Sequence, residues 1–156
     1  MKTILYILLQ TLFLLTAQSD ESHLTNENVI QLTDQTFEHQ TQASTGQTTG
    51  KWFVMFYAQW CGHCKKLMPI WNDLANGIDP EDDGNIIIAA VDTDKNPGLA
   101  SRFSIRGFPT LLYFADRKMY RYTLERSIKS FLEFATTKYR YVSKMHILYY
   151  THTLKI

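Results

Sequence analysis

A run of apolar residues that leads directly into two closely spaced cysteines is the feature that most constrains how this chain folds. Residues 52–58 are almost wholly apolar, and Trp60-Cys61-Gly62-His63-Cys64-Lys65 follows at once. Such a run is typical of a strand buried on both faces, as in the centre of a parallel sheet. A strand that delivers Cys-x-x-Cys to the start of a helix indicates a redox pair, because both sulfurs lie on one turn. We therefore expect the pair to carry chemistry rather than to staple the fold.

The cysteine count limits the alternatives. Cys61 and Cys64 are the only cysteines among 156 residues. They cannot form a framework of several disulfides, and two thiols do not complete a four-ligand zinc site within one chain. A metal site shared by two chains is left as an alternative. The composition, 45% hydrophobic and 20% charged, is that of a globular protein, and a net charge of +1 gives no reason to expect nucleic-acid binding.

Residues 1–19 have the layout of a secretory signal peptide. Lys2 precedes an apolar stretch over residues 4–15, and the small residues Ala17 and Ser19 suit a cleavage site, with a cut after Ala17 as the alternative. A membrane anchor is the competing interpretation, but a span takes ~20 apolar residues and this run is shorter. Secretion would place the thiols where a disulfide persists.

The remaining pattern predicts one α/β domain over residues 26–139, built on a mixed sheet with helices on both faces. We expect Thr33 and Asp34 to cap a helix that carries Phe37. The other expected elements follow from apolar periodicity: strands at 29–32, 52–58 and 86–91, a hairpin of 111–114 and 119–122, and helices from the cysteine motif, over 96–103 and from Ile128. Residues 140–156 form a basic, aromatic tail, which we expect to be solvated, with contact to an anionic membrane as the alternative.

With its elements in this order, the chain resembles the thioredoxin superfamily, and specifically a catalytic domain of the protein disulfide isomerase group. The motifs that carry the resemblance span residues 29–139 and are the segment 56–69, Val91-Asp92, Arg106-Gly107-Phe108-Pro109-Thr110 and Arg126-Ser127. The resemblance implies a thioredoxin-like fold. It also implies a thiol–disulfide oxidoreductase that forms or rearranges disulfides in folding secretory proteins.

Within the motif the two cysteines are expected to differ in role. Cys61 should lie at the N-terminus of a helix, where unpaired amides and the helix dipole favour a thiolate. His63 adds a positive charge or a hydrogen bond. We therefore assign Cys61 as the attacking thiol and Cys64 as the resolving thiol, with no cofactor beyond their redox-active disulfide and no metal. The pair Gly62-His63 matches the oxidising members of the family, which favours an oxidase or isomerase over a reductase.

The resemblance also implies a substrate-binding side. Pro109 matches a proline that is cis in this family and leaves the backbone of Phe108 open to an extended substrate, beside Gly107. Trp60 and Phe108 would supply apolar surface for unfolded clients, with core packing as the alternative. Arg126 matches an arginine that turns toward the second cysteine, with a solvated surface cation as the alternative.

Two positions depart from the family together. Met55 stands where the family has a buried acid that takes the proton of the resolving cysteine, and Ala90 stands where a lysine often pairs with that acid. Losing both avoids an unpaired buried charge. We expect the fold to tolerate the change, oxidation to be retained, and isomerisation or turnover to weaken.

The expected clients are unfolded or misoxidised secretory proteins, and a thiol oxidant or glutathione would recycle the cysteine pair. The expected location is the endoplasmic reticulum lumen. Thr153-Leu154-Lys155-Ile156 is not a Lys-Asp-Glu-Leu type retrieval signal, so secretion, retention by a partner and a longer natural end all stay open. A chaperone-like module without catalysis and a thioredoxin-like reductase are the alternative functions.

Overall fold

The structure is a computed structural model that describes residues 26–45, 49–79 and 84–141. The signal-peptide prediction for residues 1–19 and most of the predicted tail lie outside the described residues. Within the described part, no helix is long and apolar enough to cross a membrane.

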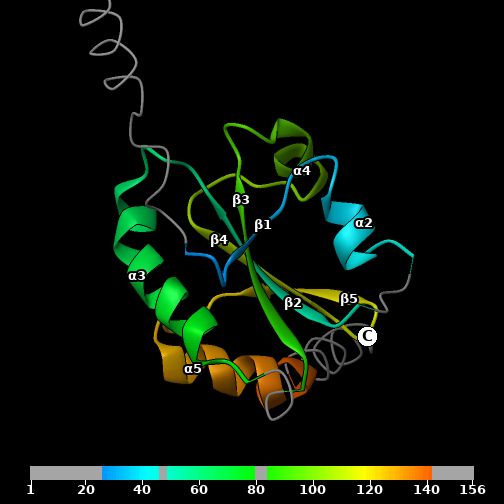
Figure 1. The fold of residues 1–156 in the computed structure, drawn as a ribbon, viewed down its shortest axis with the longest axis vertical. Coiled ribbons are helices and arrows are strands. Elements are labelled where there is room, and N and C mark those ends of the chain that lie inside the picture. Colours follow the sequence, from blue (N-terminus) through cyan, green and yellow to red (C-terminus); the bar gives the residue numbers. More distant parts are fainter. Residues whose placement is uncertain (1–25, 46–48, 80–83, 142–156) are drawn as a thin grey trace, which may run out of the picture.

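A mixed sheet of five strands lies at the centre of the molecule (Figure 1), in the order β1-β3-β2-β4-β5. β1, β3 and β2 are parallel, and β2–β4 and β4–β5 are antiparallel pairs. The bounds of the strands are β1 (Ile30–Gln31), β2 (Lys51–Tyr57), β3 (Ile86–Asp92), β4 (Thr110–Ala115) and β5 (Lys118–Tyr122). The α/β fold class predicted from the sequence, including the closing hairpin, is confirmed.

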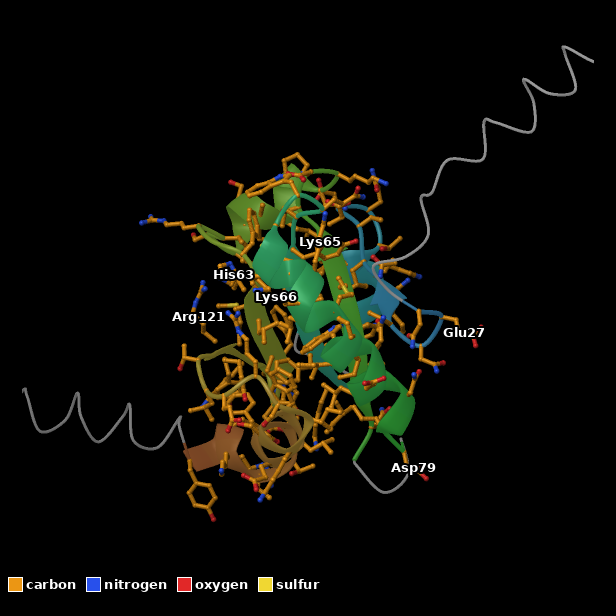
Figure 2. All side chains as sticks on the ribbon, turned by 90° about the vertical axis from the view of Figure 1, so that its left-hand side faces the viewer. Glu27, His63, Lys65, Lys66, Asp79 and Arg121 are labelled. Atoms are coloured by element: carbon orange, nitrogen blue, oxygen red, sulfur yellow. The ribbon has the colours of Figure 1, made fainter. Side chains whose placement is uncertain are left out.

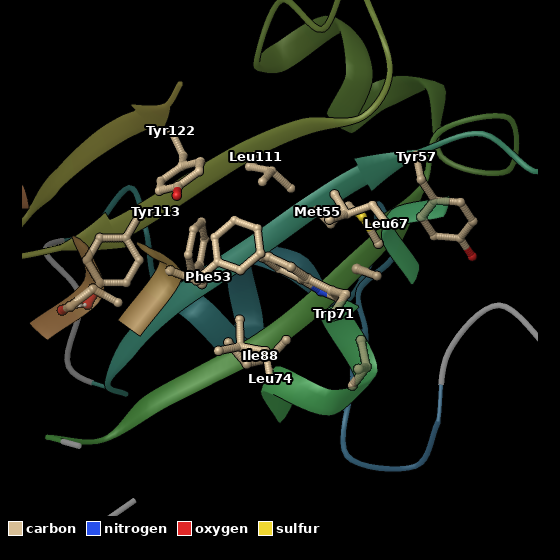
Figure 3. Close-up of a cluster of buried hydrophobic side chains, with 14 of the residues drawn as sticks. Phe53, Met55, Tyr57, Leu67, Trp71, Leu74, Ile88, Leu111, Tyr113 and Tyr122 are labelled. Atoms are coloured by element: carbon tan, nitrogen blue, oxygen red, sulfur yellow. Dashed lines mark hydrogen bonds between the residues drawn. The ribbon is translucent and has the colours of Figure 1, made fainter. Parts of the chain in front are cut away.

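Helices cover both faces of this sheet (Figure 1), which explains why the apolar run of β2 is continuous. Alternate side chains of a strand point to opposite faces. Phe53 and Met55 pack in one hydrophobic cluster with Trp71 of the helix that follows the cysteines (Figure 3), whereas Trp52 and Val54 pack in the other cluster. The bounds of the helices are α2 (Phe37–Thr41), α3 (Gly62–Gly77), α4 (Pro97–Arg102) and α5 (Ile128–Glu133).

The capping prediction for Asp34 is wrong. The residue that precedes α2 is Thr36, without a side-chain capping bond, although the Thr36 amide donates to the Thr33 hydroxyl oxygen at 3.2 Å in the turn before the helix. The Asp34 carboxylate instead accepts the amides of Gly98 at 3.1 Å and Leu99 at 2.8 Å. Asp34 therefore caps the first turn of α4, because the fold brings that helix start against the β1–α2 connection.

The last helix changes its winding after α5. Residues Phe134–Lys138 form a π-helical segment, η1, and helical backbone continues to Tyr141, into the segment predicted as a tail. The Tyr113 hydroxyl donates to the Ala135 carbonyl at 2.7 Å and so anchors η1 to β4. The sequence pattern predicted a helix from Ile128 onward, but it did not predict the π-helical winding of this segment.

Candidate active site

Cys61 lies at the N-terminus of α3, at the point where the chain leaves the sheet. Its backbone is extended, and its sulfur accepts the amide hydrogen of Cys64 at 3.2 Å. The Cys61 side chain is 7% exposed, and both cysteines are free thiols in this structure. A helix of 16 residues presents unpaired amides and a partial positive charge at this end. The geometry therefore favours negative charge on the Cys61 sulfur.

Cys64 lies one turn deeper and has no exposed surface. Burial is the main cause that raises the pKa of the Cys64 thiol to about 12, and the hydrogen bond with Cys61 acts in the same direction. A backbone hydrogen bond at Ala58 and the positive charge of Arg126 act in the opposite direction. Both thiols are buried, but they differ in position, since Cys61 caps the start of α3 and Cys64 lies within the first turn with no exposed surface.

The segment before β4 contains a cis peptide bond between Phe108 and Pro109. Pro109 is buried, and the Gly107 carbonyl accepts the Thr110 hydroxyl at 2.7 Å. A Cβ atom added at Gly107 would meet nothing within 4 Å, and the same is true at Gly62. The outer side of this segment is therefore open at Gly107.

Two aromatic rings connect this segment to the cysteine motif. The ring centroids of Trp60 and Phe108 lie 5.7 Å apart in an edge-to-face arrangement. Trp60 is 69% exposed, and its indole N–H donates to Asp94 at 3.4 Å. Phe108 is half-buried and packs against the core cluster. Trp60 is thus not a core residue, whereas Phe108 both supports the fold and borders the site.

Arg126 and His63 complete the set of residues predicted from the sequence. The Arg126 side chain is exposed and donates to the Pro109 carbonyl at 3.4 Å, so its charge is held near the buried thiol. His63 is exposed on the first turn of α3 (Figure 2). The structure therefore brings together residues from the cysteine motif, the cis-proline segment and the start of α5.

Met55 and Ala90 are direct partners in the parallel register of β2 and β3. Both are fully buried, in the same hydrophobic cluster as Cys64. The two departures from the family pattern therefore occupy one place in the core. An apolar pair fills it without leaving a charge unmatched.

One polar group next to this site was part of a motif named in the sequence but was given no role there. Asp92 is 6% exposed and accepts hydrogen bonds from the Gln59 side chain at 2.9 Å and from the Asp94 amide at 3.1 Å. It pairs in register with Tyr57, whose pKa is raised to about 12 by burial first and then by the negative charges of Asp92 and Cys64. A lone acid at the end of an apolar strand was the available signal. Among the described residues, no group of three or more His, Cys, Asp or Glu side chains is placed to hold a metal ion.

Comparison with known proteins identifies the family. The Thioredoxin family model matches residues 28–137. The chain belongs to the thioredoxin family, and the resemblance seen in the sequence is confirmed.

The relatives and solved structures place the chain with the protein disulfide isomerase-like domains of this family. The chain is 46% identical over 119 residues to a thioredoxin domain-containing protein of Theileria parva, covering 76% of this chain and 50% of that protein. It is 43% identical over 97 residues to protein disulfide-isomerase A6 of Homo sapiens, covering 62% of this chain and 21% of that protein. Human ERp44 (crystal form I) matches with a TM-score of 0.60 and 27% identity, over 72% of this chain and 29% of that one. The chain thus spans half or less of the length of these relatives.

Proposed function

We propose that this chain is a thiol–disulfide oxidoreductase of the protein disulfide isomerase kind. The observation that carries the proposal is the placement of Cys61 at the N-terminus of α3, with Cys64 buried one turn below. The similarity to protein disulfide-isomerases supports the same reaction class. The substrates are disulfides and thiols of secretory proteins during folding.

Oxidation of a client proceeds through a mixed disulfide. A client thiolate attacks the Cys61 sulfur of the oxidised pair, which breaks the Cys61–Cys64 bond and releases Cys64 as a thiolate that takes up a proton. A second client thiolate then attacks the client sulfur of the mixed disulfide. The client leaves with its own disulfide, and two electrons remain on the enzyme as reduced Cys61 and Cys64. A thiol oxidant or glutathione disulfide accepts them and restores the pair.

Isomerisation uses the reduced enzyme. The Cys61 thiolate attacks a wrongly paired client disulfide, and the released client thiolate attacks elsewhere in the client. Escape from a trapped mixed disulfide requires the Cys64 thiolate, whose formation burial opposes. With Met55 in the core beside Ala90, no acidic side chain at that position takes this proton. We therefore expect oxidation to be retained and isomerisation to be weak.

The client binds beside the cis-proline segment. Trp60 and Phe108 offer an apolar surface, and the open outer side at Gly107 leaves room for an extended chain. An extended backbone lying there would place its cysteine near Cys61. We propose the secretory pathway, in particular the endoplasmic reticulum lumen, as the location, on the strength of the leader-like N-terminus and the similarity to protein disulfide-isomerases.

A chaperone-like module without catalysis is the second candidate, because Trp60 exposes a large apolar surface. The double variant Cys61→Ser/Cys64→Ser distinguishes the two. We expect it to lose all oxidation of a reduced two-cysteine peptide, measured by thiol titration, while the single variant Cys64→Ser accumulates a mixed disulfide. Wild-type protein that never oxidises the peptide, but suppresses client aggregation as well as the double variant does, would contradict the enzyme and leave the chaperone.

A further inference from the structure

Exposed basic side chains lie on the segments that carry the cysteine pair and on those that contact the cis-proline segment. They come from α3, the segment before the cis-proline, β5 and the residues just before α5, and they are Lys65, Lys66, Arg106, Arg121 and Arg126, which we call the basic rim. The structure shows ion pairs at Arg102–Glu38, Lys138–Glu133 and Arg140–Asp116. In the described part of the chain, no rim residue is in an ion pair.

The lysines of the rim lie at the end of the first turn of α3 and just beyond it. Lys65 and Lys66 are close to the N-terminus of α3, on the side of the molecule that carries His63 (Figure 2), and the first turn contains no acid. Helix N-termini favour negative charge, so cations there cost stability unless something else compensates them. An anionic group bound at this end would remove that conflict.

The arginines of the rim are held at the segment where a client would lie. Arg121 extends from β5 to the Thr110 hydroxyl at 3.5 Å, and Arg126 contacts the Pro109 carbonyl at 3.4 Å. The acids of the same region are Asp92, which is buried and accepts hydrogen bonds from Gln59 and the Asp94 amide, and two exposed acids. Asp94 is bonded to Trp60, and Glu125 precedes Arg126 in the chain.

We infer that the basic rim selects clients that carry acidic residues next to their cysteines, an inference that rests on the proposed function. The net charge of the whole chain is only +1, so the preference arises from local placement and not from overall charge. Complementary charge around a site accelerates encounter and fixes orientation, and its effect falls as salt screens it. The rim would therefore act on client affinity and association, while the chemistry stays with the cysteine pair.

The test compares two labelled peptides that have the same spacing between their cysteines. The cysteines are flanked by glutamates in one peptide and by lysines in the other. Binding is measured by fluorescence anisotropy on the Cys61→Ser/Cys64→Ser protein, so that no reaction intervenes. We expect the glutamate peptide to bind about tenfold more tightly at low salt, with the preference falling toward unity in ~0.5 M salt. Adding Lys66→Glu and Arg121→Glu should abolish or reverse the preference. The matched control Arg117→Glu/Lys118→Glu changes the same charge at the far end of β4 and should retain it.

Equal binding of the two peptides, or a preference that survives equally in the rim variant and the control, would overturn the inference. If circular dichroism shows that the rim variant does not fold, the test is the salt dependence of peptide binding to the protein whose rim is unchanged. A preference for the glutamate peptide that salt does not weaken would also overturn the inference. Peptide oxidation is measured separately on the protein with both cysteines. Acid-selective binding without oxidation would keep the rim and refute the proposed enzyme.

Discussion

Met55 of β2 lies directly opposite Ala90 of β3, and this buried apolar pair occupies the place where the family pattern has an acid and a lysine. We predict that Met55→Glu alone destabilises the fold by ~3–5 kcal/mol, because it buries a charge without a partner. The double variant Met55→Glu/Ala90→Lys should be destabilised by less than the sum of the destabilisations of its two single variants. Its isomerisation turnover should rise roughly tenfold or more above that of the wild type. Urea unfolding and refolding of a scrambled client measure the two effects. An unchanged turnover in a folded double variant would mean that this proton route does not limit the protein.

The burial of Cys64 predicts a steep pH dependence for the resolving step. Because the pKa of this thiol is raised to about 12, its thiolate fraction increases about tenfold per pH unit throughout the neutral range. A mixed disulfide between Cys61 and a chromophoric thiol should therefore resolve about tenfold faster for each unit between pH 7 and 9. Release of the chromophore, followed by absorbance, measures this rate. A plateau below pH 9 would show that the Cys64 thiol ionises more readily than its burial indicates.

Arg126 supplies a positive charge that lowers the pKa of the Cys64 thiol, against the effect of burial. Arg126→Gln should slow resolution of the same mixed disulfide severalfold at pH 7, whereas Arg126→Lys should restore part of the rate. The initial attack by the reduced Cys61 thiolate on a client disulfide should change little, since that step does not require the Cys64 thiolate. Arg117→Gln, at the tip of the β4–β5 hairpin, is the control. Identical resolution rates in Arg126→Gln and wild type would assign Arg126 a role at the Pro109 carbonyl only.

Asp34 ties the β1–α2 connection to the first turn of α4 through its two amide contacts. Asp34→Ala should lower the free energy of unfolding by ~1–2 kcal/mol, as the loss of a helix cap does. Asp34→Asn should recover part of this, because one carbonyl oxygen still accepts. Gly98→Ala should also destabilise, since its added Cβ would meet Asp34 Oδ2 at 2.7 Å. Free energies of unfolding from urea titration that lie within ~0.3 kcal/mol of wild type for all three variants would contradict the cap.

Local patterns were sufficient to predict the order of strands and helices and the cysteine motif at the start of α3. Burial of both faces of β2 is visible in its unbroken apolar run, and the turn of two residues between the cysteines fixes their separation. The capping role of Asp34 at α4 could not be predicted from the sequence, because its partner Leu99 is 65 residues away in the chain. The π-helical segment also has a contact that sequence does not reveal, because the Tyr113 hydroxyl of β4 donates to the Ala135 carbonyl 22 residues away.

At the site too, features carried by consecutive residues could be predicted, whereas contacts between distant elements could not. The roles proposed for Cys61 and Cys64 follow from a motif of consecutive residues. The attachment of Arg121 to Thr110 depends on the hairpin register and on the length of an extended side chain. The hydrogen bond from the Gln59 side chain to Asp92 connects the ends of β2 and β3, which only the assembled sheet brings together. Such contacts between distant elements carry no periodic signal.

The reduction potential of the Cys61–Cys64 pair, equilibrated against glutathione, tests the central claim most directly. A thiolate favoured at the N-terminus of α3 stabilises the reduced pair, so we predict a reversible two-electron couple at ~−180 mV, as in protein disulfide isomerase. A value of ~−270 mV, as in thioredoxin, would indicate a reductase. A pair that does not titrate reversibly would contradict the account.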